Sequence, residues 1–395
     1  MPLRLGNDLA RRVWLHRNAL AEPPSGPAEG AGLLALIERL GFVQIDSINT
    51  VERAHHMILW SRRTSYRPAN LRPLLERYRS LFEHWTHDAA IIPMAFLPHW
   101  RLRFARRAER LRDRYRAWQG PEFESRLLEV LAHIRDHGPV GSADLGPDTP
   151  RGAGGWWDWH PSKTALEFLW HTGEIAVTRR EGFAKIYDLA ERIYPPRPAM
   201  APQATIDWAC AAAIERLGFA TSGEIAAFWD MVTPEEARRW CAARMADGLL
   251  EPIEVEGADG TLRRAFAPPG LVAAASALPA APSRVRVLSP FDPALRDRAR
   301  VERLFGYHFR IEVFVPQARR RYGYYVFPVL EGESLIGRID MRARRQEGRL
   351  EVAAFWPEPG VAMGRGRRER LQSELDRIAR FCGCGAVGHA DDWLR

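Results

Sequence analysis

The feature that most limits the possible folds is a plan of helices and a β-hairpin that occurs twice in the middle of the chain. Residues 123–200 show a helix (FESRLLEVLAHIRDHG), a turn with a short second helix (PVGSADLG), a third helix (SKTALEFLWHTG) and two short strands around a Glu-Gly turn. Residues 203–268 repeat the plan, with three helices and a hairpin that turns at an Asp-Gly pair. This order is typical of winged helices, so the sequence predicts tandem winged-helix units.

The segments before the first repeat alternate between helical and extended patterns. GAGLLALIERLGF has apolar residues at helical spacing and a glycine at its end, and FVQID looks like a strand. We interpret residues 1–90 as a degenerate third copy of the repeated unit. The predicted elements are helices at 8–20, 30–40 and 47–62, a strand at 42–46, and a long basic helix near 96–118.

The last third of the chain has a different pattern. PPGLVAAASALPAAPS is the clearest linker, and beyond it RVRVLSP, HFRIEVFVP, RYGYYVFPVLEG, SLIGRIDMRAR and GRLEVAAFW read as strands. GRGRRERLQSELDRIARFCG is an amphipathic helix near the C-terminus. A small β-rich domain or barrel follows from this order.

The predicted fold class is therefore α+β, with tandem winged-helix (helix-turn-helix) units followed by a C-terminal β-rich, barrel-like domain. The predicted domains are an N-terminal winged-helix-like unit at 1–120, a second winged helix at 121–200, a third at 201–275, and the β-rich domain with its terminal helix at 284–395.

The charge balance indicates a polyanionic partner. The chain has 57 Lys and Arg against 49 Asp and Glu, a formal net charge of +8 and a pI of about 9.7. Together with the helix-turn-helix units, this favours double-stranded DNA over a membrane surface or a protein partner. Nearly all the cations are arginine, with lysine only at Lys163 and Lys185. A GC-rich genome also gives that bias, although arginine suits bidentate phosphate contacts.

Cysteine spacing and hydropathy indicate a cytoplasmic protein. Cys210, Cys241, Cys382 and Cys384 contain no CxxC pair, so we expect reduced thiols rather than disulfides or zinc ligands. No apolar run approaches the ~18 residues of a membrane span, and the N-terminus lacks a signal-peptide pattern.

The most specific candidate site is Gln44-Ile45-Asp46. In a strand, Gln44 and Asp46 project to the same side while Ile45 enters the core. A carboxylate beside an amide suits water attack, since Asp46 can orient or deprotonate the water and Gln44 can hold it. Two ordinary alternatives remain: a surface strand with outward polar residues, or Asp46 capping a helix that begins at Ser47.

Two further polar groups lie nearby in the sequence. Glu52, His55 and His56 would share one face of the predicted helix at 47–62. Zinc requires at least three protein ligands, and a di-iron site requires a second Glu-x-x-His that is absent here, so we predict a hydrogen-bonded cluster and no metal. His87 and Asp88 either line the same cleft as Gln44 and Asp46 or are simply packed.

Arginine and tryptophan runs are candidates for DNA contact. The predicted DNA-binding arginines are Arg319, Arg320, Arg321, Arg338, Arg342, Arg344 and Arg345. Such runs are more commonly solvated faces, but both lie in one domain of a basic protein. Trp156, Trp157 and Trp159 either stack on DNA or brace the second winged helix.

Taken together, these segments resemble the AlkZ/YcaQ-type winged-helix DNA glycosylases. QIDSINTVERAHHMILWSR is similar to the active-site segment of that family. LFEHWTHDAAIIP, GWWDWHPSKTALEFLWHTGEIAVTRREGFAKIYDLAERIYP, VLSPFDPALRDRARVERLFGYHFRIEVFVP and RRRYGYYVFPVL resemble its other hallmarks, in the same order, from about residue 9 to about residue 390. The resemblance is specific because no single motif carries it.

The resemblance implies three winged-helix units and a C-terminal β-domain. It also implies excision of N7-alkylguanine and unhooking of N7-linked interstrand crosslinks in bacterial DNA, with no cofactor. The catalytic motif of the family is Gln-apolar-Gln in one branch and Gln-apolar-Asp in the other, and this sequence matches the Asp branch. That branch resembles enzymes that act on nitrogen-mustard-type crosslinks and monoadducts.

The implied chemistry agrees with the residues. N7 alkylation leaves a positively charged base that departs without a general acid, so a carboxylate and a positioned water suffice. Backbone-nicking glycosylases need an amine for a Schiff base. Lys163 and Lys185 are far from Gln44 in sequence. After loss of Met1, Pro2 would expose a secondary amine that is able in principle to form the Schiff base, but an inert N-terminus is the more ordinary interpretation, so we expect a monofunctional enzyme.

Two other functions are compatible with parts of the pattern. A non-catalytic winged-helix transcriptional regulator is the main alternative, although regulators usually bind as symmetric dimers on paired half-sites. Three different units in one chain favour a monomer. A Mg²⁺-dependent nuclease would need clustered carboxylates, and we find no convincing cluster.

Overall fold

The N-terminal part of the chain folds into helices around a small antiparallel sheet. The computed structural model describes residues 3–145 and 161–395. The elements up to residue 119 are β1 (Leu3–Leu5), α1 (Asn7–Arg17), α2 (Gly30–Leu40), β2 (Val43–Gln44), α3 (Ala54–Arg62), β3 (Leu81–Trp85), β4 (Ala89–Pro93) and α4 (Leu97–Gln119). Strands β2, β4 and β3 form one sheet in that order. The predicted helix at 47–62 is wrong in its first half, since α3 begins only at Ala54.

The first of the two repeats pairs helices with a three-stranded sheet. Its elements are α5 (Phe123–His137), β5 (Val140–Gly141), α6 (Pro161–Thr172), β6 (Ile175–Glu181), β7 (Ala184–Leu189) and α7 (Ala190–Ile193). The two longer helices and the hairpin are confirmed, but residues 142–145 form a turn where a short helix was predicted. Gly173 ends α6 at φ +80, and a Cβ there would lie 2.2 Å from the Phe104 ring. Glycine is therefore required at this helix end.

The second repeat follows the predicted order of three helices and a hairpin. Its elements are α8 (Pro202–Leu217), α9 (Ser222–Trp229), α10 (Pro234–Ala246), β8 (Glu251–Glu256), β9 (Leu262–Ala267) and α11 (Leu271–Ser276). Capping boxes begin α9 and α10, where Thr221 and Thr233 each bond reciprocally with a glutamate three residues on. Strand β1 joins this sheet parallel to β8. The predicted linker is partly ordered, because α11 buries Leu271 and Ala275.

The C-terminal part is a curled half-barrel sheet with one long helix. Its elements are β10 (Val285–Val287), α12 (Arg298–Phe305), β11 (Val326–Glu331), β12 (Ser334–Arg344), β13 (Arg349–Pro357), α13 (Arg365–Phe381) and β14 (Ala386–His389). The strands are adjacent in sequence order, antiparallel except for the last pair. Helix α12 and strand β14 were not predicted. The predicted strand HFRIEVFVP is wrong, because residues 308–316 form an irregular loop.

The N-terminal and C-terminal parts share one hydrophobic core. Apolar side chains from α2 and α3 pack in the same cluster as those from the C-terminal sheet and α13. Trp60 of α3 stacks on Phe381 of α13, with 5.1 Å between ring centroids. The fully buried Arg62 also forms an ion pair with the fully buried Asp292. The segment that carries Gln44 and Asp46 is therefore held directly against the C-terminal part.

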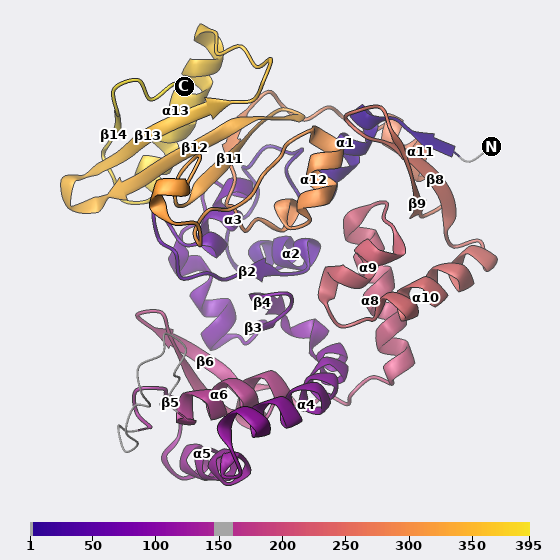
Figure 1. Ribbon diagram of the computed structural model, residues 1–395, viewed down its shortest axis with the longest axis vertical. Coiled ribbons are helices and arrows are strands. Elements are labelled where there is room, and N and C mark those ends of the chain that lie inside the picture. Colours follow the sequence, from indigo (N-terminus) through magenta and orange to yellow (C-terminus); the bar gives the residue numbers. More distant parts are fainter. Residues whose placement is uncertain (1–2, 146–160) are drawn as a thin grey trace.

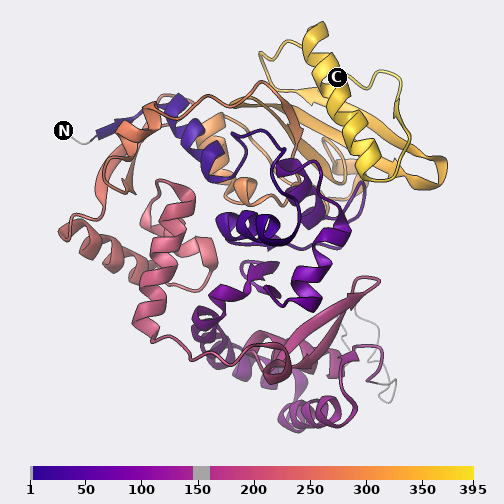
Figure 2. The ribbon, with the colours of Figure 1, turned by 180° about the vertical axis from the view of Figure 1, so that it is seen from behind.

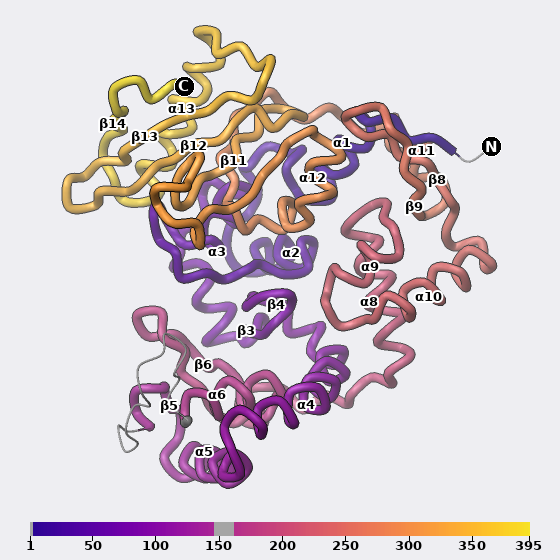
Figure 3. Tube along the Cα trace, viewed as in Figure 1, coloured from indigo at the N-terminus to yellow at the C-terminus, as the bar shows by residue number. Residues whose placement is uncertain are grey.

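The figures show how these parts are arranged. In Figure 1 the C-terminal sheet lies at the top, helices α8–α10 at the right and α4–α6 at the bottom, with α2 and β2–β4 between them. Figure 2 shows α13 lying along the sheet as seen from behind. The N-terminal strand runs beside the trace of β8 in Figure 3, as the parallel pairing requires. Among the described residues, no helix is long and apolar enough to cross a membrane.

Candidate active site

The small sheet brings the Gln-Ile-Asp segment beside a turn that follows β3. Gln44 pairs with Ala90 of β4, and the Ile45 amide donates to the Ala89 carbonyl at 2.8 Å. This pairing places the end of β2 next to His87 and Asp88, which precede β4. The structure therefore brings His87 and Asp88 together with Gln44. This is the arrangement required by the sequence alternative in which they line the same cleft.

Gln44 is held by two directional hydrogen bonds. Its side chain is 4% exposed, and its Nε2 donates to Asp88 Oδ2 at 3.1 Å. Because Nε2 is the donor, Oε1 must accept, and His87 Nε2 lies 3.1 Å from it. His87 therefore carries its proton on Nε2, and its Nδ1 lies 3.2 Å from the Thr86 hydroxyl, which donates to the Asp88 carbonyl at 3.3 Å. This network fixes the orientation of the Gln44 amide.

Asp46 lies just beyond the end of β2 and is half-buried. Its Oδ1 accepts the Ile48 amide at 2.7 Å, which closes a tight turn. Asp46 does not cap a helix, since α3 starts eight residues later at Ala54. Among the described residues, its Oδ2 has no hydrogen-bond partner, so this oxygen is available to a water or a substrate atom.

Burial raises the pKa of both carboxyl groups, and repulsion from Asp88 adds to the rise for Asp46. Desolvation raises the pKa of Asp46, the Ile48 amide opposes that rise, and the nearby Asp88 carboxylate adds to it. Desolvation also raises the pKa of Asp88, against the Ala89 amide and the Lys185 ammonium. Asp88 is joined to this segment by its hydrogen bond to Gln44, two residues before Asp46.

His87 is neutral at physiological pH. Desolvation, together with the positive charges of Arg296, Arg103 and Arg298, lowers the pKa of His87 to about 3. A neutral imidazole that donates from Nε2 is consistent with the bond to Gln44 Oε1. His87 is thus a hydrogen-bonding brace for Gln44 rather than a cation.

A model of the family described as "DNA glycosylase AlkZ-like" matches residues 37–381. The chain belongs to the AlkZ-like DNA glycosylase family. A solved structure, the DNA glycosylase AlkZ of Streptomyces sahachiroi, is similar over 100% of both chains with a TM-score of 0.66 and 16% sequence identity. That likeness in fold covers both the helical part and the C-terminal sheet, and the matched family segment includes the whole Gln44 cluster.

Several groups near Gln44 and Asp46 were not identified from the sequence. Tyr325, at the start of the C-terminal sheet, has a raised pKa from burial, and the Asp46 carboxylate contributes to that rise. Arg298 lies 4.7 Å over the Phe309 ring, and its Nη1 is buried without a hydrogen-bond partner in the described part of the chain. No spacing signal connects these residues to Asp46, since more than 250 residues separate them.

Lys185 is closer to the cluster than its sequence position suggests, because its charge acts on Asp88. Its Nζ is nevertheless engaged, at 2.8 Å from Glu167 Oε1 and 3.7 Å from the centre of the Trp170 ring. Burial also lowers the pKa of Lys185, although the Glu167 carboxylate opposes this.

Glu52, His55 and His56 form a separate group in this AlkZ-like chain. Glu52 lies before α3 and pairs with Arg345 at 3.2 Å, so the predicted shared helix face is wrong for it. His55 and His56 line a cavity of about 290 Å³ that also contains Ile45. Desolvation lowers the pKa of both, to about 4 for His56, whose Nδ1 lies 2.8 Å from the Tyr66 hydroxyl. They take no part in the hydrogen bonds of the Gln44 side chain.

The predicted DNA-binding arginines divide into two kinds. Arg338 is 4% exposed, pairs with Glu358 and donates to the His308 carbonyl at 3.1 Å, so the prediction of DNA contact is wrong for it. Arg320 is half-buried, with its Nε donating to the Val315 carbonyl at 2.8 Å. The exposed arginines are Arg319, Arg321, Arg342, Arg344 and Arg345.

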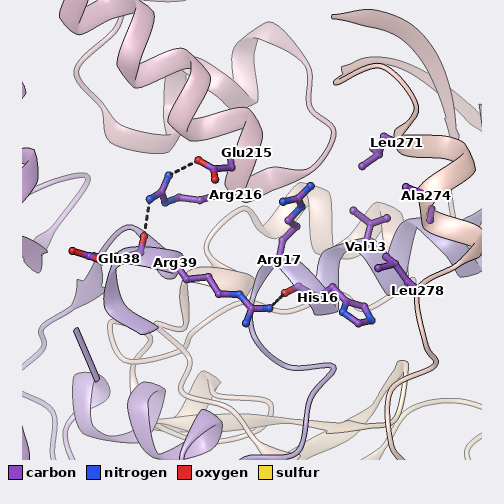
Figure 4. A pocket seen from close by; sticks show the side chains of 11 residues that line it. Val13, His16, Arg17, Glu38, Arg39, Glu215, Arg216, Leu271, Ala274 and Leu278 are labelled. Carbon is purple, nitrogen blue, oxygen red and sulfur yellow. Dashed lines mark hydrogen bonds and ion pairs between the residues drawn. The ribbon is translucent and has the colours of Figure 1, made fainter. Parts of the chain in front are cut away.

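Other candidate sites lie away from the Gln44 cluster or outside the residues that the structure describes. No group of three metal-binding side chains occurs within residues 3–145 and 161–395. A cavity of about 540 Å³ lies between α1, α2, α8 and α11, lined by apolar residues and by Arg17, Arg39 and Arg216 (Figure 4). It contains none of the predicted site residues. Pro2, Trp156, Trp157 and Trp159 lie outside the described residues.

Proposed function

We propose that this protein is a monofunctional DNA glycosylase that hydrolyses the N-glycosidic bond of N7-alkylguanine and unhooks N7-linked interstrand crosslinks. The observation that carries the proposal is the cluster in which Asp88 and His87 fix the Gln44 amide beside the partly buried Asp46. Membership of the AlkZ-like family supports the same reaction class. The specific substrate follows from the chemistry that this cluster is able to support.

The cluster supplies an anion and a positioned amide but no evident acid for the leaving base. An N7-alkylated guanine is already cationic, so its departure needs no proton. The sugar then acquires oxocarbenium character, which the ionised Asp46 stabilises from its Oδ2 side. Asp46 accepts the proton of the attacking water, and Gln44 holds that water by a hydrogen bond.

Neutral His87 fits this division of roles. With a pKa of about 3 it holds no proton beyond the one on Nε2, and that proton is committed to Gln44 Oε1. A neutral base such as unmodified guanine would need protonation as it leaves. We therefore expect selectivity for lesions that carry their own positive charge.

The lysine contacts favour a glycosylase that leaves an abasic site. A Schiff base requires a free, unprotonated amine at the sugar C1′. The Lys185 amine is instead paired with Glu167 and packed on Trp170. We therefore retain the monofunctional assignment, although Lys185 is nearer to Asp88 than its sequence position suggests.

Duplex binding is assigned to the repeated helical units and the exposed arginines. We propose that the units at 121–200 and 201–275 are winged helices, that 1–120 is a degenerate winged-helix-like unit, and that 284–395 contributes the β-domain. Arg319, Arg321 and Arg342 are exposed, as are Arg344 and Arg345, which would exchange their ion pairs with Glu351 and Glu52 for phosphates. The chain would act as a monomer, and its active site would be exposed so that a bulky crosslink is able to reach it.

The test uses one duplex with a single 7-methylguanine and one with a nitrogen-mustard crosslink. Each is incubated in EDTA with wild type, Asp46→Asn or the control Asp136→Asn, then treated with alkali to reveal abasic sites. Asp136 is an exposed carboxylate of α5. We expect cleavage by wild type and by the control, and a loss of about 10²–10⁴-fold in rate for Asp46→Asn. Tight binding with no cleavage of either duplex would instead support the transcriptional regulator.

A further inference from the structure

The loop between α12 and β11 exposes an aromatic side chain almost completely. Phe314 is 95% exposed, whereas Leu128, another exposed apolar side chain, is 68% exposed. A phenylalanine in water forgoes the free energy that burial would supply. Its position on a loop of a DNA-binding family therefore calls for a partner.

The loop is held rigidly from within. The Glu312 carboxylate accepts three backbone amides, from Arg321 at 2.9 Å, Tyr322 at 2.8 Å and Gly323 at 3.1 Å. The Arg320 Nε also donates across the loop to a carbonyl at 2.8 Å. These bonds close the loop without any strand pairing, so Phe314 is presented by a fixed backbone.

The loop packs against the same hydrophobic cluster as the candidate active site. Ile311 and Val313 pack against the hydrophobic cluster that contains Ile45, the residue between Gln44 and Asp46. Tyr325, which follows the loop, lies close enough to Asp46 for that carboxylate to raise its pKa. In Figure 1 this orange segment runs between α12 and β11 along the C-terminal sheet.

The charges around Phe314 select nucleic acid as the partner. Arg319 and Arg321 are exposed on the same loop, and Tyr324 is 42% exposed with the Arg320 guanidinium 5.0 Å from its ring centre. Apolar wedges flanked by arginines unstack base steps, with the arginines on the adjacent phosphates.

We propose that Phe314 is a wedge that enters the base stack of the duplex beside the lesion, while Arg319 and Arg321 hold the flanking phosphates. The inference rests on the proposed function, since it assumes that duplex DNA is the substrate. It adds the means by which the duplex is opened at the site. The wedge separates the damaged nucleotide from its neighbour, and Asp46 then reaches the sugar.

The test measures unstacking directly and needs no catalysis. The probe is a duplex with 2-aminopurine beside a tetrahydrofuran abasic-site analogue, and all proteins carry Asp46→Asn. We expect the parent to raise the 2-aminopurine fluorescence, Phe314→Ala to lose that rise and about 10-fold in affinity, and Phe314→Trp to restore both. Leu128→Ala, an exposed apolar control on α5, should match the parent.

The arginines have a separate readout. Removing Arg319 or Arg321 should reduce the slope of log affinity against log salt concentration by about 0.9 each, while Phe314→Ala leaves the slope unchanged. The proposal would be overturned if Phe314→Ala left the fluorescence and the affinity for the duplex unaltered. It would also be overturned if Phe314→Ala lost binding to phosphatidylglycerol vesicles but kept its binding to the duplex. The two proposals are separable. If the fluorescence rise depends on Phe314 but the wild-type protein does not excise 7-methylguanine, the wedge is supported and the proposed reaction is refuted.

Discussion

The buried ion pair between Arg62 and Asp292 should decide whether the segment that carries the candidate site stays attached to the C-terminal part. Both side chains are 0% exposed, and Arg62 Nη2 lies 2.8 Å from Asp292 Oδ1 while Nη1 contacts the other oxygen. Arg62 also donates to the Asn18 carbonyl at 3.1 Å, and Asp292 Oδ1 accepts the Ala294 amide at 3.0 Å. Removing either partner leaves an uncompensated charge in the core.

The expected magnitude follows from that burial. Arg62→Met or Asp292→Leu should each lower the free energy of unfolding by about 3–5 kcal/mol, since the remaining ion loses its counter-charge. The double variant should cost only about 1–2 kcal/mol, because no charge is left unpaired and the losses are neutral hydrogen bonds, such as those to the Ala294 amide and the Asn18 carbonyl. The coupling free energy between the two positions should therefore exceed about 2 kcal/mol.

Urea unfolding followed by tryptophan fluorescence measures these values, because Trp60 lies in the core that the pair joins to α13. Arg72→Met provides the control, since Arg72 is 74% exposed in its pair with Glu76 and should cost less than about 1 kcal/mol. A cost below about 1 kcal/mol for Arg62→Met, or additive costs in the double variant, would refute the reasoning.

Four further outcomes are expected of the reaction. Excision should fall as the pH drops through the raised pKa of Asp46, because only the ionised form acts. Asp88→Asn should move this fall in rate to lower pH, because it removes the repulsion that Asp88 exerts on Asp46. A pH–rate profile that does not shift in Asp88→Asn would contradict this. His87→Ala should slow excision about 10-fold by releasing the Gln44 amide, while the affinity for undamaged duplex stays unchanged. EDTA should leave the single-turnover rate unaltered, whereas a rate restored by Mg²⁺ would indicate a metal-dependent enzyme. Borohydride should trap no protein–DNA adduct, and Lys185→Arg should retain excision; a trapped adduct lost in Lys185→Arg would identify a lyase.

Local signals in the sequence predict most of the helices and hairpins. Apolar spacing with a terminal glycine predicts α2 and α6 at the positions observed, and the Asp-Gly pair marks the β8–β9 turn. Alternation misleads at HFRIEVFVP, where the pattern is that of a strand. The carboxylate of Glu312 takes the three amides of a neighbouring turn, and this local bonding replaces a ladder.

The candidate site was only partly accessible from the sequence, for reasons of register and distance. Alternation identifies Gln44 and Asp46, but the partners of Gln44 depend on which residue of β4 lies opposite β2. Sequence spacing does not specify that register. Tyr325 packs in the core that joins segments at opposite ends of the chain, and the charge of Arg298 acts on His87. Tertiary packing alone brings these residues to the cluster.

The protonation states of the cluster constrain which lesions it is able to process. The Asp46 carboxylate, whose pKa is raised by burial and by Asp88, is a stronger base than a solvated carboxylate. Among the described residues of the cluster, it is the charged group that keeps an oxygen without a hydrogen-bond partner. His87, the neighbouring group that would ordinarily act as an acid, is neutral and committed to Gln44. The cluster is thus arranged to receive positive charge and to accept a proton, not to deliver one. On the proposed function, we expect such a site to accelerate the loss of bases that are cationic before they bind, and to leave neutral bases in place even when they reach it.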